Sequence, residues 1–382
     1  MARKSSPSSP TGPLRVVIAG GGTGGHLYPG IAVARELLSR VPDAIIIFAG
    51  TAKGIEARVV PREGFVLDVI RSAGLKGKSF TERLLGLGLL PLGGADAVSL
   101  LARRRPHVVI GVGGYSSGAV VALAALRGIP TLLLEQNAVP GLTNRTLAPL
   151  VRAAAVTFEA TLPYFKGKGF VSGNPVRSTF LDAEAVDTHH EPGAPVGVLI
   201  FGGSQGAHAI NVAAVEAAPE LAASGASLSI THQTGERDVE MVREGYLGAG
   251  LAARVEPFLF SMDREMKAAQ VVVCRAGATT LAEITAAGRA AVLVPLPTAT
   301  DNHQRKNADV LARAGAADVI DQRELSGRRF AAAILALAHD PERRGRMAQA
   351  ARTLAKPDAA RVIVDRILAL AGRHADVSGP PE

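Results

Sequence analysis

The feature that most restricts the fold of this chain is the alternation of short apolar runs with Ala- and Leu-rich stretches. The runs are apolar at consecutive positions, which is typical of parallel strands covered by helices on both faces. The eight clearest runs span residues 14–20, 44–50, 107–112, 131–136, 196–203, 227–233, 270–274 and 290–295. The pattern predicts an α/β fold built from doubly wound parallel sheets.

A polar segment between Gly173 and Gly197 interrupts this rhythm and is the expected linker. The length of 382 residues is enough for two domains. Each half begins with a strand, a glycine loop and a helix, since GGGTGGH (20–26) has a counterpart in GGSQGAHAIN (202–211). We therefore expect two Rossmann-like domains facing each other across a cleft, which both loops line at the carboxyl ends of the strands.

Composition excludes several classes of protein. The formal net charge is +8, but no Trp and only 4% aromatic residues argue against a single-strand nucleic-acid platform. The lone Cys274 excludes a disulfide framework and a CxxC zinc site. No apolar run precedes residue 14, so we expect no secretory signal. The uncharged stretch 108–126 contains GVGGYSSG, which favours a strand, a loop and a buried helix over a membrane span.

The first glycine loop satisfies G-x-G-x-x-G, a weak dinucleotide fingerprint. A nicotinamide enzyme usually has an acidic residue at the end of the second strand, but this chain has FAGT at 48–51 and its next acid is Glu56. Glycine backbone at the start of a helix favours binding of a phosphate group. The alternative interpretation of these glycines is that they allow tight packing of the strand on the helix. Three further loops, at 111–118, 202–207 and 275–283, have the same potential to bind phosphate. Four such loops favour one ligand with two phosphates, or two ligands with one diphosphate each.

The fourth loop, RAGATTLAE, predicts a helix whose first turn, 278–280, presents amides and hydroxyls to an anion. Glu283 follows one turn later and could accept both hydroxyls of a ribose, or could be an ordinary exposed helix acid. We find no D-x-D pair and no HExxH motif in the sequence. We therefore expect no metal and no cofactor, and helix termini together with cations such as Arg177 would neutralise a diphosphate.

Four further polar residues, near the ends of strands or in the glycine loops, are candidates for chemistry. His26 follows the first loop and could take a proton from a hydroxyl nucleophile, or could cap a helix or contact phosphate. Glu135 is the rival base, and Asn137 beside it suits hydrogen bonds to a sugar. Tyr115, in the second loop, could meet either sugar or peptide.

From about residue 14 to residue 373 the chain resembles the bacterial N-acetylglucosaminyltransferases that convert lipid I to lipid II. The shared motifs, in order, are GGTGGHLYPG, GVGGYSSG, EQNAVPGLTNR, GNPVR, FGGSQGA, VVVCRAGATTLAEI and DNHQRKNA. The resemblance implies a GT-B fold with an acceptor-side and membrane-side domain at 14–176 and a UDP-sugar-binding domain at 177–357. It also implies that the last helix, at 358–373, packs back on the first domain.

The resemblance further implies a UDP-N-acetylglucosamine site drawn from both domains. Its residues would be Thr23, Gly24, Gly25, Asn137, Arg177, Ser204, Leu259, Ala278, Thr279, Thr280, Leu281, Ala282, Glu283 and Gln304. The backbone of Leu259 would meet uracil and Gln304 would contact the sugar, on the resemblance alone. His26 and Tyr115 match positions with acceptor or catalytic roles, and Glu135 remains the alternative base.

The implied reaction is an inverting transfer from UDP-N-acetylglucosamine to the C4 hydroxyl of the N-acetylmuramyl unit of lipid I. The enzyme would work peripherally at the cytoplasmic face of the membrane, with cell-wall synthesis proteins as neighbours and no nucleic-acid partner. Segment 75–105 mixes leucines with basic residues and could dock on the bilayer, or its leucines could pack on the sheet. The chain departs from the usual family motifs at Leu134, Ala119, Ala276 and His303.

Three other functions stay open on the sequence. The first is a glycosyltransferase for another lipid or polyketide acceptor. The second is a nicotinamide-dependent oxidoreductase, which FAGT at 48–51 disfavours. The third is a nucleotide-sugar-binding protein without turnover.

Overall fold

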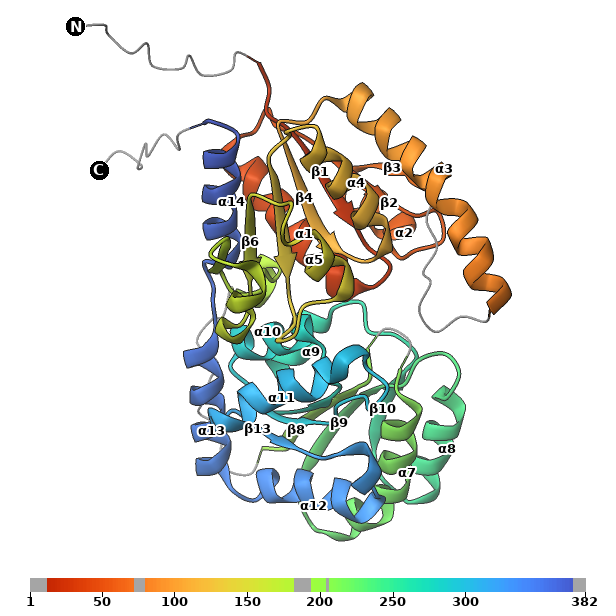
Figure 1. Ribbon diagram of the computed structural model, residues 1–382. Coiled ribbons are helices and arrows are strands. Elements are labelled where there is room, and N and C mark those ends of the chain that lie inside the picture. The colour runs from red at the N-terminus through yellow and green to blue at the C-terminus, as the bar shows by residue number, and fades with distance from the viewer. Residues whose placement is uncertain (1–11, 72–79, 182–193, 204–205, 374–382) are drawn as a thin grey trace, which may run out of the picture. The chain divides into compact units, whose positions relative to one another are not determined.

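The chain forms two compact units, each with one parallel sheet and helices on both faces (Figure 1). The computed structural model describes residues 12–71, 80–181, 194–203 and 206–373. The first unit comprises Met1–Gln136, Pro140–Pro175 and Asp358–Glu382, and the second comprises Asn137–Val139 and Val176–Pro357. The predicted α/β fold with two doubly wound parallel sheets is confirmed.

The sheet of the first unit has the strand order β3-β2-β1-β4-β5-β6-β7, and every pair is parallel. The strands are β1 (Arg15–Gly20), β2 (Ile45–Gly50), β3 (Val66–Val69), β4 (Val108–Gly113), β5 (Thr131–Glu135), β6 (Ala153–Val156) and β7 (Gly169–Val171). The sequence predicted β1, β2, β4 and β5, which are long and buried. It missed the short β3, β6 and β7, because a run of three or four residues carries little apolar signal.

Helices cover both faces of this sheet. They are α1 (Gly24–Arg40), α2 (Glu56–Arg62), α3 (Phe80–Arg104), α4 (Tyr115–Leu126), α5 (Leu142–Leu147), the 3-10 helix η1 (Glu159–Phe165) and α14 (Ala359–Leu370). Apolar residues of α1, α2 and α14 form the core on one face, and those of α3, α4, α5 and η1 form the core on the other. The uncharged stretch 108–126 forms β4 and α4, as predicted. Among the described residues, no helix is both long and apolar enough to span a bilayer.

The second unit has the strand order β10-β9-β8-β11-β12-β13, again with parallel pairs throughout. The strands are β8 (Val196–Phe201), β9 (Leu228–Gln233), β10 (Ala253–Glu256), β11 (Val271–Cys274), β12 (Ala290–Leu293) and β13 (Ala317–Val319). Four of the predicted runs correspond to β8, β9, β11 and β12. The direction of the strand order reverses between β8 and β11, where the third and fourth glycine loops begin.

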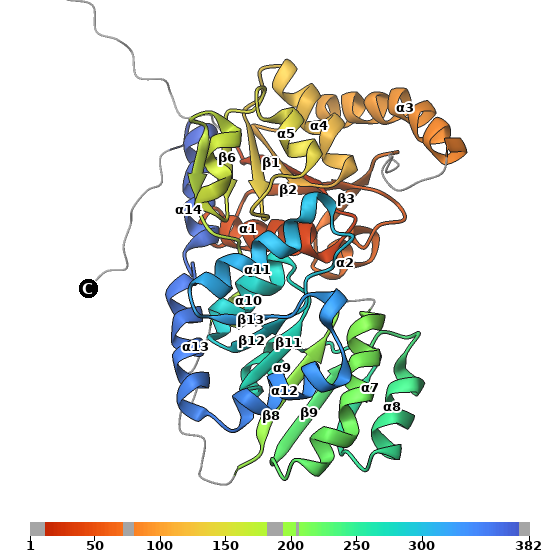
Figure 2. The same ribbon diagram turned by 60° about the horizontal axis from the view of Figure 1, so that its bottom comes forward.

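The helices of the second unit also divide between two apolar cores. They are α6 (Ser178–Leu181), α7 (His208–Ala223), α8 (Val239–Gly248), α9 (Met262–Ala268), α10 (Ala278–Ala287), η2 (Thr300–Asn302), α11 (His303–Arg313), η3 (Gln322–Glu324), α12 (Gly327–Ala338) and α13 (Pro341–Leu354). One core contains residues of α7, α8 and α12, and the other contains residues of α6, α9, α10 and α11. Helix α12 packs against both α7 and α13 (Figure 2).

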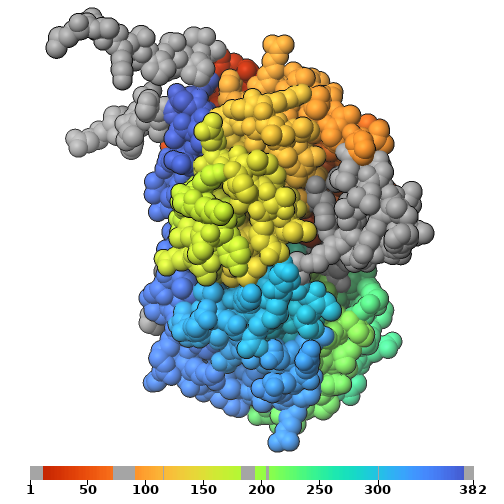
Figure 3. Space-filling model, in the orientation of Figure 1, coloured from red at the N-terminus to blue at the C-terminus, as the bar shows by residue number. Residues whose placement is uncertain are grey.

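The C-terminal helix α14 belongs to the first unit although α13 belongs to the second. Its buried residues Ile363, Val364 and Ile367 join the core that α1 covers, and Arg40 of α1 pairs with Asp365 at 2.7 Å. In Figure 3 its blue surface borders the yellow-green surface of segment 153–171. Burial of this apolar stripe fixes α14 on the first unit.

A buried carboxylate holds the first glycine loop and the loop after β2. Glu56 is 1% exposed, and its Oε2 accepts the Gly22 N–H at 2.8 Å. Its Oε1 accepts both the N–H and the hydroxyl of Thr51, each at 2.8 Å. A Cβ on Gly21 or Gly54 would lie 2.6 or 2.1 Å from atoms of this side chain. The glycines therefore allow two backbone segments to close around one carboxylate.

We predict that Glu56→Ala destabilises the first unit by roughly 3 kcal/mol, because it removes the acceptor of three donors and each buried donor without a partner costs about 1–3 kcal/mol. Urea unfolding of the full chain measures the loss of stability. Amide hydrogen exchange in β1 and β2 locates that loss in the first unit. The exposed Asp43→Ala in the same unit is the control and should change stability by at most about 0.5 kcal/mol. Equal midpoints for the two variants would show that Glu56 does not support the loop.

Candidate functional site

The first and second glycine loops meet at the carboxyl ends of β1 and β4, where the strand order of the first unit reverses direction. The Gly21 N–H donates to the Gly113 carbonyl at 3.3 Å. A Cβ on Gly20, whose φ is +137°, would lie 2.2 Å from the same carbonyl oxygen. A Cβ on Gly114 would lie 2.6 Å from the Gly21 oxygen. Only glycine permits this contact, and such switch points are where ligands bind in α/β sheets.

Each of these loops opens a helix, as predicted. Thr23 is the N-cap of α1 in an extended conformation, and Gly24 and Gly25 form the first turn. Thr23 and Gly25 are exposed. Tyr115 is the first residue of α4, after Gly114 as N-cap. The N-termini of α1 and α4 thus carry partial positive charge and favour a bound anion.

His26 lies half-buried on the first turn of α1, beside the second loop. Its Nδ1 is 3.1 Å from Oε1 of Gln136, a side chain that is 2% exposed and directly follows β5. Burial lowers the pKa of His26 from its ordinary value, and hydrogen bonds to Gln136 and to the Val112 carbonyl oppose part of that shift. The imidazole is therefore neutral near pH 7 and able to accept a proton.

Glu135, the rival base, is 2% exposed at the end of β5. Its Oε2 accepts the Gly141 N–H at 3.1 Å and the Asn144 amide at 2.8 Å. Asn144 also donates to the Leu134 carbonyl. This carboxylate therefore holds the N-terminus of α5, and the geometry favours His26 over Glu135 as the group that meets substrate.

Asn137 lies in the short segment Asn137–Val139, which groups with the second unit. Its Oδ1 accepts from the Asn307 amide at 3.2 Å, and Oδ1 of Asn307 accepts the Ala138 N–H at 2.9 Å. Asn307 is fully buried and also donates to the Ala276 carbonyl. One asparagine of α11 thus ties the predicted sugar-binding residue to the start of the fourth loop.

The third glycine loop follows β8, and its predicted ligand Ser204 lies outside the described residues. Gln233, at the end of β9, donates to the Gly203 carbonyl at 2.9 Å. Its Oε1 accepts the Leu259 N–H at 2.9 Å. Gln233 therefore links the third loop to the segment expected to meet uracil, and the N–H of Leu259 is already used by the protein.

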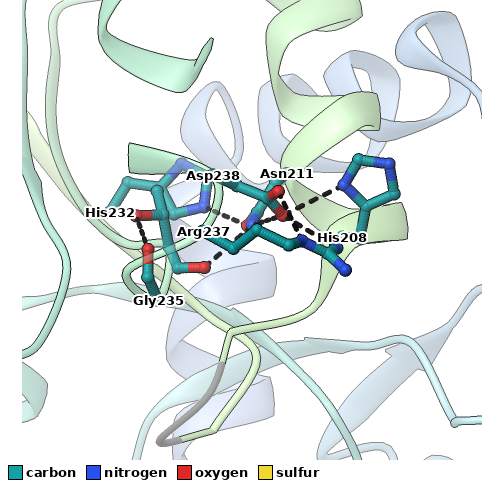
Figure 4. Close-up of polar contacts among 7 residues, drawn as sticks. His208, Asn211, His232, Gly235, Arg237 and Asp238 are labelled. Atoms are coloured by element: carbon teal, nitrogen blue, oxygen red, sulfur yellow. Dashed lines mark hydrogen bonds and ion pairs between the residues drawn. The ribbon is translucent and has the colours of Figure 1, made fainter. Parts of the chain in front are cut away.

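A polar network joins the start of α7 to the segment that follows β9 (Figure 4). Asn211 donates to the Thr234 carbonyl at 2.9 Å and to Asp238 at 2.8 Å, while its Oδ1 is 3.1 Å from Nε2 of His232. Burial opposes ionisation of Asp238, but hydrogen bonds from Arg237, Asn211 and His208 outweigh it and lower its pKa to about 2. Burial lowers the pKa of His232 to about 3, so this ring is neutral. The network fixes the backbone at 234–235.

The fourth loop follows β11 and opens α10 as predicted, with Gly277 as N-cap. Ala278, Thr279 and Leu281 are at most 7% exposed, whereas Thr280 and Ala282 are half-buried. The side chain of Leu281 belongs to the apolar core. The Leu281 N–H donates to the Gly277 carbonyl at 2.9 Å, so neither its side chain nor its N–H is offered to a ligand.

Glu283 is half-buried one turn into α10. Burial raises its pKa to about 7, Arg177 lowers it by charge attraction, and Asp263 raises it further. The Arg177 guanidinium lies 5.0 Å from the ring centroid of Phe180, which directs it across α6. Glu283 is thus a carboxyl group that changes its charge near neutral pH, next to a fixed cation.

Gln304, in the first turn of α11, accepts the Leu296 N–H through Oε1 at 2.9 Å. The Arg275 guanidinium donates to the carbonyls of Val294 and Pro295. Together they fix the loop that leaves β12. The amide oxygen of Gln304 therefore has a structural partner, and its amide nitrogen is the group to test against a sugar.

Four residues that shape the site were not singled out from the sequence, namely Glu56, Gln136, Gln233 and Asn307. Gln136 and Asn307 lie inside motifs EQNAVPGLTNR and DNHQRKNA, and Gln233 ends an apolar run. For Gln136 and Gln233 the available signal was a polar residue at the end of a buried strand, where its side chain must find partners. Glu56 begins α2 and Asn307 lies within α11, so neither carries that signal. Across the residues that the structure describes, no group of three His, Cys, Asp or Glu side chains could hold a metal ion.

Comparison with known proteins assigns the family. The glycosyltransferase family 28 N-terminal domain matches residues 16–156, and its C-terminal domain matches residues 197–363. A UDP-N-acetylglucosamine--N-acetylmuramyl-(pentapeptide) pyrophosphoryl-undecaprenol N-acetylglucosamine transferase of Pelobacter propionicus is 46% identical, over 93% of this chain and 99% of the relative. A protein of the same name from Anaeromyxobacter sp. is 47% identical over 92% of each chain.

The crystal structure of Acinetobacter baumannii MurG is similar at a TM-score of 0.73 with 31% identity, covering 94% of this chain and all of that one. The calicheamicin glycosyltransferase CalG4 shares the fold at a TM-score of 0.66 with 16% identity, over 96% of this chain and all of that one. Together these matches cover residues of both units. The chain belongs to glycosyltransferase family 28.

Proposed function

We propose that the chain transfers N-acetylglucosamine from UDP-N-acetylglucosamine to lipid I, the undecaprenyl-pyrophosphoryl N-acetylmuramyl pentapeptide, and so forms lipid II. The relatives that carry the name of this reaction match more than nine-tenths of the chain at 46–47% identity. The structural observation that carries the proposal is a neutral, half-buried His26 at the junction of two glycine loops. This arrangement suits proton removal from a hydroxyl nucleophile.

In this proposal the second unit binds the donor. Glu283 as a carboxylate accepts the two ribose hydroxyls, and the N-terminus of α10 with Arg177 stabilises the diphosphate. Ser204 and the third loop contribute to the same diphosphate. The backbone of Leu259 meets uracil through its carbonyl, since its N–H donates to Gln233. Asn137 and Gln304 contact the transferred sugar.

The first unit supplies the base and the acceptor contacts. His26 takes the proton as the C4 hydroxyl of the acceptor forms a bond to the anomeric carbon, and the bond from that carbon to the diphosphate oxygen breaks with its electron pair. Tyr115 and the N-terminus of α4 bind the acceptor, whereas Thr23, Gly24 and Gly25 at the N-terminus of α1 contact UDP-N-acetylglucosamine. Holding both reactants at attack distance can supply on the order of 7–11 kcal/mol of the barrier.

A lipid-linked acceptor requires the enzyme to work at a membrane surface, and we place it peripherally at the cytoplasmic face, where the UDP-sugar is available. Segment 75–105 is the proposed docking region, although residues 72–79 lie outside the described part. Arg103 and Arg104 at its end both pair with Asp68, at 3.1 and 2.8 Å. These two charges are therefore partly satisfied within the protein, so Lys76 and Lys78 would carry more of the attraction to lipid.

A transfer assay with radiolabelled UDP-N-acetylglucosamine and a short-chain lipid I analogue tests the function. Labelled disaccharide product supports it. Nucleotide binding without turnover would support the non-catalytic alternative, and transfer to a different acceptor alone would move the chain to another glycosyltransferase class. Both of these outcomes contradict the proposal.

We predict that His26→Ala lowers kcat in this assay by about 10²–10⁴-fold, the usual loss for a general base. The exposed His339→Ala, at the end of α12, is the matched control and should keep wild-type turnover. If His26→Ala retains near-wild-type kcat at saturating substrates, His26 is not the base.

We predict that UDP binds more tightly as the pH rises through about 7, because Glu283 must be ionised to accept both ribose hydroxyls. The free energy of unfolding without nucleotide should change in the opposite direction. Because the pKa of Glu283 is raised in the folded protein, its protonated form stabilises the fold, and this stabilisation is lost as the pH rises through about 7. Calorimetric titration between about pH 6 and about pH 8 should show a steeper pH dependence for wild type than for Glu283→Gln. Identical pH profiles would exclude Glu283 from the ribose contact.

We predict that the chain co-sediments with vesicles rich in phosphatidylglycerol and that added salt weakens this binding. The double variant Lys76→Glu, Lys78→Glu should bind these vesicles much more weakly. The control double variant Lys166→Glu, Lys356→Glu changes the net charge by the same amount elsewhere and should bind as the wild type does. Binding that is insensitive to both anionic lipid and salt would argue against electrostatic docking.

A further inference from the structure

Gln136 has two fixed hydrogen-bond partners, and both belong to the site of the first unit. Its Nε2 is 3.2 Å from the Val112 carbonyl oxygen, at the end of β4. Its Oε1 is 3.1 Å from Nδ1 of His26. At 2% exposure, the side chain is shielded from bulk water.

These partners determine which end of the amide faces which neighbour. A carbonyl oxygen can only accept, so the amide nitrogen of Gln136 must face Val112. The amide oxygen therefore faces His26, and an amide oxygen also can only accept. The Val112 carbonyl, the other acceptor beside the ring, already accepts from the Gln136 amide. It follows that Nδ1 of His26 carries a proton and donates it to Gln136.

The backbone beside His26 keeps the imidazole in this orientation. Gly113 has a φ of +100°, and a Cβ there would lie 2.8 Å from Nδ1 of His26. The absence of a side chain at this position lets the ring edge pack directly on the loop after β4. Since burial also lowers the pKa of His26, the ring holds one proton near neutral pH.

We propose that Gln136 is a positioning residue that keeps the proton of the neutral His26 on Nδ1 and so leaves the lone pair on Nε2, the atom that receives the proton of the acceptor hydroxyl. When Nε2 takes that proton the ring becomes an imidazolium, and its Nδ1–H still donates to Gln136. The amide thus orients the base before the reaction and stabilises the charge that forms on it. This inference rests on the proposed function of His26.

Nitrogen NMR of the full-length protein labelled with 15N-histidine tests the tautomer without any activity measurement. Long-range proton–nitrogen spectra distinguish a protonated from an unprotonated ring nitrogen, and His26→Ala identifies the signals of His26. At a pH where the ring is neutral, we expect the proton on Nδ1 in the wild-type protein. A proton on Nε2 would overturn the inference, whatever the transfer assay shows.

Substitution of Gln136 tests the consequence for catalysis. Gln136→Leu removes the acceptor, so the proton should move to Nε2 in a substantial fraction of molecules, and kcat should fall by about tenfold or more with little change in the KM for UDP-N-acetylglucosamine. Gln136→Glu keeps an oxygen acceptor beside Nδ1 but removes the amide donor to the Val112 carbonyl. We expect the proton to stay on Nδ1 and the pH profile of kcat to move to higher pH, because a carboxylate stabilises the imidazolium. Thr131→Val, a buried substitution at the start of β5, the strand that Gln136 follows, is the control for general disturbance of this region.

Unchanged tautomer and kcat in Gln136→Leu would also overturn the inference. A failure of the proposed function gives a different result, in which His26→Ala retains turnover while the wild-type ring still carries its proton on Nδ1.

Discussion

The first unit depends on a contact between two backbone segments that side chains would prevent. Gly20 and Gly21 at the end of β1 lie against Gly113 and Gly114 at the end of β4, and a Cβ at Gly20 would be 2.2 Å from the opposing carbonyl oxygen. This contact brings the starts of α1 and α4 together at the reversal of the strand order. It also puts the ring of His26 within reach of Gln136, although 110 residues separate them. Bare backbone therefore creates both the anion-binding helix ends and the environment of the base.

The second unit reaches a similar arrangement with different side chains. Gly206 packs so closely on the backbone after β9 that a Cβ would lie 1.8 Å from the Thr234 carbonyl oxygen. Asn211 holds that same carbonyl, and Gln233 joins the third loop to Leu259. Buried amides that satisfy several backbone groups at once are a common way to fix loops that cannot form regular secondary structure.

The main elements of the fold were predictable from the sequence because their signals are local. Long buried strands such as β1 and β4 are continuous apolar runs, and the loops that open α1, α4 and α10 are read from adjacent glycines. Short strands such as β3 and β13 have too few residues to carry a pattern. Their positions depend on pairing with β2 and β12.

The side chains that support the site could not be predicted, because their partners lie far away along the chain. Glu56 was noted only as an acid in the wrong place for a nicotinamide enzyme, yet it binds Gly22, which is 34 residues earlier. The protonation behaviour of Glu283 depends on its burial and on Arg177 and Asp263, none of which its own motif reveals. Motif resemblance named Leu259 as a ligand, but only the structure reveals that Gln233 already uses its N–H.

The central claim is that helix N-termini and one arginine, instead of a metal ion, hold the diphosphate of the donor. The most direct measurement is a crystal structure of the chain with UDP bound in the presence of a metal chelator. We expect the ribose to lie on Glu283 and the diphosphate to lie between the N-terminus of α10 and Arg177. Nucleotide bound elsewhere, or bound only after a divalent ion is restored, would contradict it.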